Sequence, residues 1–152
     1  MNKILFYGYG NPGRQDDSLA NALVEKLHKW AKENNIENID FDSNYQLNIE
    51  DAELISHYDK VIFADASMEE IDDFFLSKVS PNEAKVEFSM HAVSPSYVLD
   101  LCNKIYNKIP ETYLLHIKGY QWEFMCPMTE KAEENLFAAF SYIKYKLLTY
   151  SV

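Results

Sequence analysis

Cysteine is scarce in this 152-residue chain, which contains only two. Cys102 and Cys126 show neither the spacing of a metal-binding cluster nor the pattern of a disulfide framework. Cys102 falls on the apolar side of a predicted helix, so we expect a packed, reduced thiol there, whereas Cys126 precedes Pro127 in an apolar loop. Neither cysteine has a base beside it in the sequence, so neither is a candidate nucleophile.

Positive charge and long apolar runs are also lacking. The chain has 14 basic residues against 24 acidic ones, and its formal charge of −10 repels phosphate backbones and anionic headgroups at long range. No apolar run reaches membrane-spanning length, and the N-terminus leads directly into a strand-like segment without the profile of a signal peptide. We therefore expect no nucleic-acid partner, no membrane association and a cytoplasmic location.

Core-forming residues, in contrast, are plentiful. Hydrophobic residues make up 47% of the chain, and 2 Trp, 11 Tyr and 9 Phe supply bulky side chains, which argues against disorder. The sequence contains no linker, internal repeat or low-complexity tract. Its length suits a single domain spanning residues 1–152.

Short apolar runs alternate along the chain with segments of helical periodicity. Helices are predicted from Asp17 onward, over 49–55, after a Ser94 cap, and after a Thr129 cap, the last with Leu136, Phe137, Phe140, Ile143 and Leu147 facing inward. Strands are predicted at 3–7, 39–41, 61–64, 85–90 and 113–117, while 72–80 fits either an edge strand or a short helix. This alternation predicts an α/β three-layer sandwich, with a mostly parallel twisted sheet of about five strands covered by helices on both faces.

The first loop formally resembles a nucleotide site. Residues 8–13, GYGNPG, match the G-x-G-x-x-G pattern between a strand and a helix. However, Pro12 lacks a backbone donor, and Asp16 and Asp17 place two carboxylates where a pyrophosphate would need attraction. The loop therefore suits a cation better than an anion, although this segment alone favours the interpretation that both acids merely cap the helix.

Three residues that suit a metal ion converge on one edge of the predicted sheet. Asp17 follows the first strand, Asp65 ends the strand at 61–64, and His91 ends the strand at 85–90. Parallel strands bring these positions to the carboxyl edge, where open α/β folds bind ligands. Two carboxylates and one imidazole are a plausible first shell for Zn, Ni or Fe, with positions left for water or a partner's ligand. The remaining histidines are interpreted as structural or solvated: His28, His57 and His116.

Four short motifs carry a resemblance to a known family over nearly the whole chain. They are Gly10-Asn11 followed by Asp16-Asp17, a strand ending in Asp65-Ala66, Met90-His91 followed by Pro95 and a helix, and residues 126–129, CPMT, before the last helix. In these the chain resembles the [NiFe]-hydrogenase maturation endopeptidases. The last two motifs are most similar to the proteases that process the hydrogenase large subunit of formate-hydrogenlyase systems.

The resemblance implies a hydrolase that removes the C-terminal extension from the nickel-loaded precursor of a [NiFe]-hydrogenase large subunit. It implies Asp17, Asp65 and His91 as metal ligands, nickel presented by the substrate with other divalent metals able to substitute, and a monomeric enzyme. One departure is that Ser18-Leu19-Ala20 stands where the family usually has glycine, a bulky residue and glycine. We expect this change to alter how tightly the helix packs against the loop.

We hypothesise that Asp17, Asp65 and His91 engage the nickel and position the scissile bond for attack by water. Either Asp16 or Asp17 deprotonates this water, or the metal lowers its pKa. The chemistry would be aspartate-dependent without a pepsin-like dyad, because Asp16 and Asp17 are adjacent and point in different directions. Two alternatives remain open: a noncatalytic module that captures a metal or small ligand, and a nucleotide-binding enzyme.

Overall fold

A five-stranded sheet forms the middle layer of the molecule. The structure is a computed structural model and describes residues 2–83 and 93–149. The sheet has the order β2-β1-β3-β5-β4, in which all neighbours are parallel except the edge strand β4, which is antiparallel to β5. The strands are β1 (Ile4–Tyr9), β2 (Ile39–Asn44), β3 (Lys60–Ser67), β4 (Phe74–Val79) and β5 (Glu111–Lys118).

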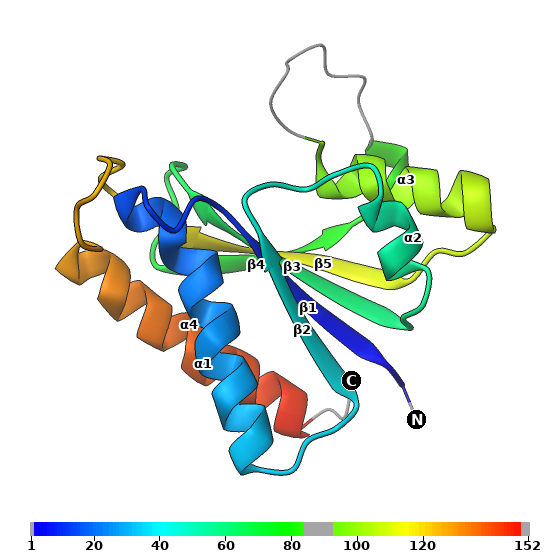
Figure 1. Ribbon diagram of the computed structural model, residues 1–152, viewed down its shortest axis with the longest axis horizontal. Helices are drawn as coiled ribbons and strands as arrows, with labels where there is room; N and C mark the ends of the chain where they lie inside the picture. Colours follow the sequence, from blue (N-terminus) through cyan, green and yellow to red (C-terminus); the bar gives the residue numbers. More distant parts are fainter. Residues whose placement is uncertain (1, 84–92, 150–152) are drawn as a thin grey trace.

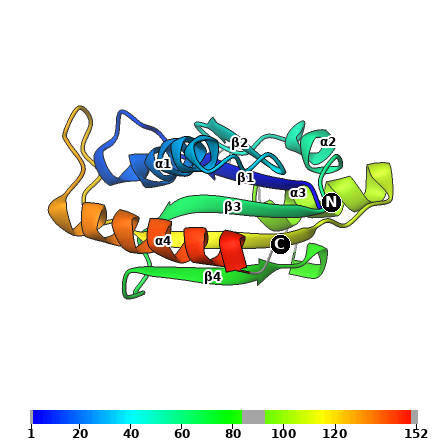
Figure 2. The same ribbon diagram turned by 90° about the horizontal axis from the view of Figure 1, so that it is seen from below.

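Helices cover both faces of this sheet, as Figure 1 and the perpendicular view in Figure 2 show. The long helices α1 (Leu19–Glu33) and α4 (Glu130–Thr149) lie on one face, and the shorter α2 (Asp51–Ile55) and α3 (Pro95–Tyr106) lie on the other. Two 3₁₀ turns, η1 (Gln15–Ser18) and η2 (Pro81–Glu83), complete the described elements. The predicted three-layer α/β sandwich is thereby confirmed. Within the described residues, no helix combines the length and apolarity needed to cross a bilayer.

Successive side chains of each strand point to opposite faces of the sheet, so the apolar side chains pack into two cores, one on each face. Ile4, Phe6 and Ile62 pack with residues of α1 and α4 in one core. Leu5, Tyr7 and Phe63 face the opposite way and pack with residues of α2 and α3. Buried apolar runs in β1 and β3 therefore serve both faces at once, as expected for central strands of a parallel sheet.

Most predicted helix boundaries agree with the structure. Ser94 Oγ accepts a hydrogen bond from Tyr97 N at 3.1 Å and caps α3, and Thr129 Oγ1 accepts one from Ala132 N at 3.2 Å at the start of α4. The ambiguous segment 72–80 contains the edge strand β4. Phe137 was wrongly predicted to face inward: it is 66% exposed, because its position on α4 lies off the stripe that meets the sheet. The strand predicted at 85–90 lies outside the described residues.

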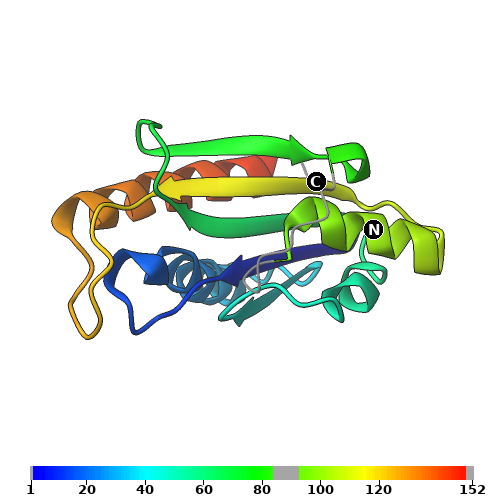
Figure 3. The ribbon, with the colours of Figure 1, turned by 90° about the horizontal axis from the view of Figure 1, so that it is seen from above.

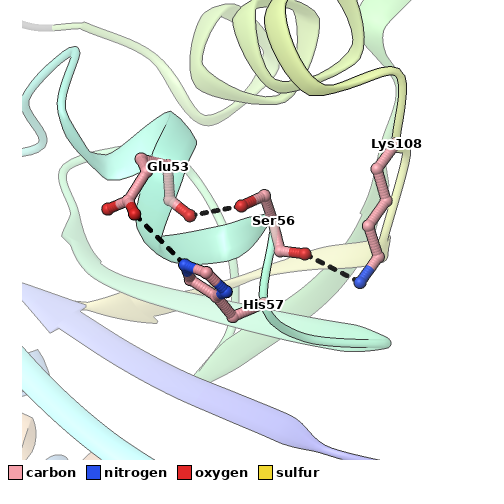
Figure 4. Close-up of polar contacts among 4 residues, drawn as sticks. All are labelled: Glu53, Ser56, His57 and Lys108. Atoms are coloured by element: carbon pink, nitrogen blue, oxygen red, sulfur yellow. Dashed lines mark hydrogen bonds and ion pairs between the residues drawn. The ribbon is translucent and has the colours of Figure 1, made fainter.

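A small polar network joins α2 to the connection before β5 (Figure 4). Its residues precede β3 and β5 in the chain, so it lies at the amino end of these strands, opposite the carboxyl edge. Lys108 Nζ donates to Ser56 O at 2.8 Å and so satisfies a carbonyl left free at the end of α2. His57 Nε2 contacts Glu53 Oε1 at 3.2 Å, and both side chains are exposed. The interpretation of His57 as a solvated residue agrees with this surface contact.

Candidate functional site at the carboxyl edge of the sheet

The turn that follows β1 holds the Asp17 side chain in a defined place. Asn11 N donates to Asp17 Oδ2 at 3.0 Å, and Gly13 N donates to Asn11 Oδ1 at 2.9 Å. Gly10 allows this close turn: its φ is +155°, and a Cβ added there would lie 2.2 Å from Asp17 O. Glycine at position 10 is thus required by the backbone path that brings Asp17 over the end of β1.

Most backbone N–H groups of this turn already donate hydrogen bonds within the protein, so few of them could bind a phosphate. Internal hydrogen bonds engage the N–H groups of Gly10, Asn11, Gly13, Arg14, Asp16 and Asp17. A phosphate-binding loop needs such groups free and directed at the anion. The G-x-G-x-x-G pattern at residues 8–13 therefore serves turn formation here.

Asp16, adjacent to Asp17, is directed into the protein and is fully buried. Its carboxylate accepts hydrogen bonds from the N–H groups of Tyr120 and Gln121, and from both N and Oγ1 of Thr129, at 2.8–3.1 Å. Burial opposes ionisation, but these hydrogen bonds outweigh it and lower the pKa of Asp16. This arrangement stabilises a permanent anion that anchors the segment 119–129.

Asp65 lies on β3 beside the Asp17 turn. Burial, followed by the charge of Asp17, raises the pKa of Asp65 to about 7, whereas a hydrogen bond from Ala66 N lowers it. The two carboxylates therefore interact electrostatically across the carboxyl edge of β1 and β3. Asp65 does not end its strand as expected, because β3 continues to Ser67 by pairing with β5. A cation or a proton between the two acids would relieve their repulsion.

Tyr9 is a neighbour of this pair that the sequence reasoning missed. Burial raises the pKa of Tyr9 well above its usual range, and the nearby charge of Asp65 raises it further. The phenol thus stays protonated and can act only as a neutral hydrogen-bonding group at physiological pH. Tyr9 and Tyr7 are two residues apart on β1, so their side chains point to the same face of the sheet, which the sequence could indicate. Nothing in the sequence indicated that Tyr9 lies near Asp65.

His91, the third predicted ligand, lies outside the described residues, so its convergence with Asp17 and Asp65 stays a prediction. Within residues 2–83 and 93–149, no group of three or more His, Cys, Asp or Glu side chains is arranged to hold a metal ion. Asp17 and Asp65 alone provide two carboxylate donors. A metal site with three or more ligands here would therefore need a further ligand from His91, from a substrate or from water.

The other histidines make local contacts. His28 stacks on Phe41 with ring centroids 5.2 Å apart. His116 faces the same side of the sheet as Asp65, its register partner, and shares a 3.0 Å hydrogen bond with Ser77 Oγ. Burial lowers the pKa of His116, which favours a neutral imidazole. These contacts fit the structural roles that were predicted for both residues.

Ser18 and Ala20 fit the packing of α1 on β1. Ser18 Oγ donates to Gln15 O at 2.7 Å and closes η1. Ala20 is fully buried, and its carbonyl oxygen would lie 2.6 Å from a Cβ added at Gly8. The missing side chain of Gly8 thus permits close helix–strand contact even with alanine at position 20, so this packing remains tight in spite of the departure from the family pattern.

Comparison with known proteins yields structural matches only. No protein-family model matches the sequence, and no curated protein matches it. The [NiFe] hydrogenase maturation protease HycI from Thermococcus kodakarensis KOD1 superposes with a TM-score of 0.76 at 17% identity, covering 97% of this chain and 94% of that one. The hydrogenase maturating endopeptidase HybD from E. coli gives 0.72 at 17% identity, with coverages of 95% and 91%.

A third similar structure is the hydrogenase 2 maturation peptidase from Thaumarchaeota archaeon SCGC_AB-539-E09. It has a TM-score of 0.68 at 18% identity and covers 97% of this chain and 98% of that chain. At such identities the likeness establishes a common fold. A fold shared over nearly the full length does not establish the activity, which has to be argued from the residues of the site.

Proposed function

We propose that this protein is an endopeptidase that removes the C-terminal extension from the nickel-loaded precursor of a [NiFe]-hydrogenase large subunit. The observation that carries the proposal is the pair Asp17 and Asp65, two interacting carboxylates at the carboxyl edge of the sheet. The fold of maturation proteases and the four sequence motifs support the same activity. The enzyme would act in the cytoplasm, as the sequence composition led us to expect, and as a monomer, as the family resemblance implies.

In this proposal nickel belongs to the substrate. Asp17 and Asp65, together with His91, would bind the nickel carried by the precursor and hold the adjacent peptide bond in place for a water molecule. A cation favours the ionised form of Asp65, because it offsets the repulsion from Asp17. Substrate binding and ionisation of the site would therefore reinforce each other.

The general base is better assigned to the Asp17–Asp65 pair than to Asp16. Asp16 accepts four hydrogen bonds, and its lowered pKa makes it a weak base. In the metal-free protein Asp65 has a pKa of about 7, so it can accept a proton near neutral pH when its oxygens are not all engaged by the ion. We assign Asp16 the role of positioning residue, since it holds the turn from which Asp17 projects.

A cleavage assay tests the proposal. Purified protein is incubated with a nickel-loaded large-subunit precursor, and loss of the extension is followed by mass spectrometry. We expect wild type to cleave, and Asp17→Asn, Asp65→Asn and His91→Ala to lose most activity. Precursor prepared without nickel should resist cleavage, since the site would then lack its recognition element.

Asp59→Asn is the matched control. Asp59 immediately precedes β3, the strand that carries Asp65, and so lies at the amino end of that strand, away from the carboxyl edge. Its side chain accepts a hydrogen bond from Lys3 N at 2.9 Å. Its substitution should leave cleavage unchanged. Absence of cleavage by wild type, combined with retained binding of nickel or precursor, would instead favour the noncatalytic binding module.

A further inference from the structure

The loop at residues 119–129, between β5 and α4, is interlocked with the Asp17 turn; we call it the tip loop. Asp16 binds both of its ends through Tyr120 N, Gln121 N and Thr129. Further hydrogen bonds run from Asp16 N to Gln121 O at 3.1 Å and from Glu123 N to Gln15 Oε1 at 3.0 Å. The backbone of the tip loop is thus held at several points along its length.

This well-held loop exposes its apolar side chains. Phe124 is 67% exposed and Met125 is 96% exposed, and Cys126 beside them is also exposed. Met125 has a φ of +59°, an unfavourable left-handed conformation for methionine, and its N–H donates to Gly13 O at 3.0 Å. The fold therefore stabilises a strained backbone whose apolar side chains are mostly exposed. Strain of this kind is typical of functional segments.

The tip loop and the Asp17 turn lie side by side at one end of the molecule, as the views in Figures 1 and 3 agree. The register of the sheet gives the reason: Lys118, which ends β5, pairs with Ser67 at the end of β3, two residues beyond Asp65. Any protein that presents a peptide bond to Asp17 and Asp65 must place part of its surface close to this loop. The tip loop is therefore continuous with the proposed active site.

We propose that Phe124 and Met125 form a docking tip that inserts into an apolar depression on the folded body of the large-subunit precursor; this inference rests on the proposed function. Aromatic and methionine side chains are enriched in the cores of protein–protein interfaces. Because hydrogen bonds already hold the loop, little further ordering would be required on binding.

The projecting shape of the tip loop favours a folded protein as its binding partner. The tip loop projects beyond the starts of α1 and α4 (Figures 1 and 2), so its complement must be concave. The loop also borders a hollow lined by Tyr120, Gln121 and Pro127–Thr129, but Phe124 and Met125 do not line it, so a small ligand bound there would not need these two side chains. Arg14 sits over the Phe124 ring, 5.4 Å from its centroid, and donates from Nε to Trp122 O, so it contacts both the side chain of Phe124 and the backbone of the loop. The extended segment to be cleaved would occupy the neighbouring acidic site rather than the tip.

Binding of the nickel-loaded precursor to immobilised protein tests the docking tip. All proteins carry Asp65→Asn so that the precursor is not consumed. We expect the double variant Phe124→Ser, Met125→Ser to bind with a dissociation constant raised on the order of tenfold or more. In the active background, the same double variant should raise KM for the precursor while kcat changes little, because the reacting groups are untouched.

The matched control is Phe137→Ser. Phe137 is 66% exposed, nearly the same as Phe124, but lies on α4 within its helical body. This variant should bind like the parent protein, and thermal melting should confirm that both variants fold. Equal binding by the tip double variant and its parent would overturn the docking tip while leaving the protease proposal intact. If the double variant binds more weakly than its parent but wild type does not cleave the precursor, the docking role of the tip loop is supported and the endopeptidase proposal is overturned. If the Asp65→Asn parent does not bind the precursor and wild type does not cleave it, both proposals fail.

Discussion

Asp16 and Thr129 contact each other at two points across 113 residues of sequence. Thr129 N donates to Asp16 Oδ1 and Thr129 Oγ1 donates to Asp16 Oδ2, each at 2.8 Å. The same hydroxyl accepts from Ala132 N at 3.2 Å and caps α4. One buried contact therefore joins the turn before α1 to the start of α4 and closes the tip loop between them.

Removing this contact should destabilise the whole fold. Asp16→Ala leaves several buried donors without an acceptor, and we expect the free energy of unfolding to fall by about 3 kcal/mol in chemical denaturation. Thr129→Ser keeps the hydroxyl and should remain close to wild type, whereas Thr129→Val should lose part of the stability. An Asp16→Ala protein as stable as wild type would contradict the anchoring role.

The same contact predicts a loss of stability in acid. The folded pKa of Asp16 is lowered relative to its unfolded value, so the native state holds the proton less tightly. Its contribution is present above the unfolded pKa of about 4 and disappears as the pH falls through the lower folded pKa. Unfolding measured from pH 5 downward should show a smaller pH dependence in Asp16→Asn than in wild type.

Asp65 should behave in the opposite way in the metal-free protein. Its pKa is raised to about 7, so the native state binds a proton that the unfolded state releases near pH 4. Stability from this group is fully present below pH 4 and is lost as the pH rises to about 7. A carboxyl ¹³C NMR titration should place the midpoint of Asp65 near 7.

Asp17→Asn separates the two causes of that raised pKa. The variant removes the charge of Asp17 and leaves the burial of Asp65 in place, so the midpoint should move down without reaching that of an exposed carboxyl group. Asp59→Asn, at the other end of β3, should leave it unchanged. An unaltered midpoint in Asp17→Asn would mean that the two acids do not interact.

Metal affinity should follow the ionisation of Asp65. A divalent ion binds the carboxylate and displaces its proton, so with a pKa of about 7 we expect affinity for nickel about tenfold weaker at pH 6 than at pH 8 by calorimetry. His91→Ala should bind more weakly but keep a pH dependence from Asp65. Asp65→Asn should lose that component, and equal affinity in this variant and wild type would remove Asp65 from the metal site.

Gly10 and Gly13 provide a matched pair of substitutions in one turn. A Cβ at Gly10 would lie 2.2 Å from Asp17 O, so Gly10→Ala must displace Asp17 and should abolish both nickel binding and cleavage. A Cβ at Gly13 meets only Asn11 Oδ1, at 3.4 Å, which is ordinary contact. Gly13→Ala should therefore retain both properties, as binding and cleavage assays would confirm.

Most of the order of elements and the placement of Asp17 and Asp65 at the carboxyl edge follow from the sequence alone. Apolar runs such as that of β1 and the caps at Ser94 and Thr129 are local signals, because hydrophobic period and capping chemistry act over a few residues. They correctly predicted the three-layer fold. The same local signals could not distinguish a strand from a helix at 72–80, since the pairing of β4 with β5 decides it.

Only the tertiary structure separated the roles of two adjacent acids. Asp16 and Asp17 look alike in sequence, yet the first meets donors from Tyr120, Gln121 and Thr129 while the second interacts with Asp65. Both outcomes depend on segments brought together by the sheet over long sequence separations. Local sequence determines which residue types are available, whereas burial and charge proximity, which exist only after folding, determine what each carboxylate does.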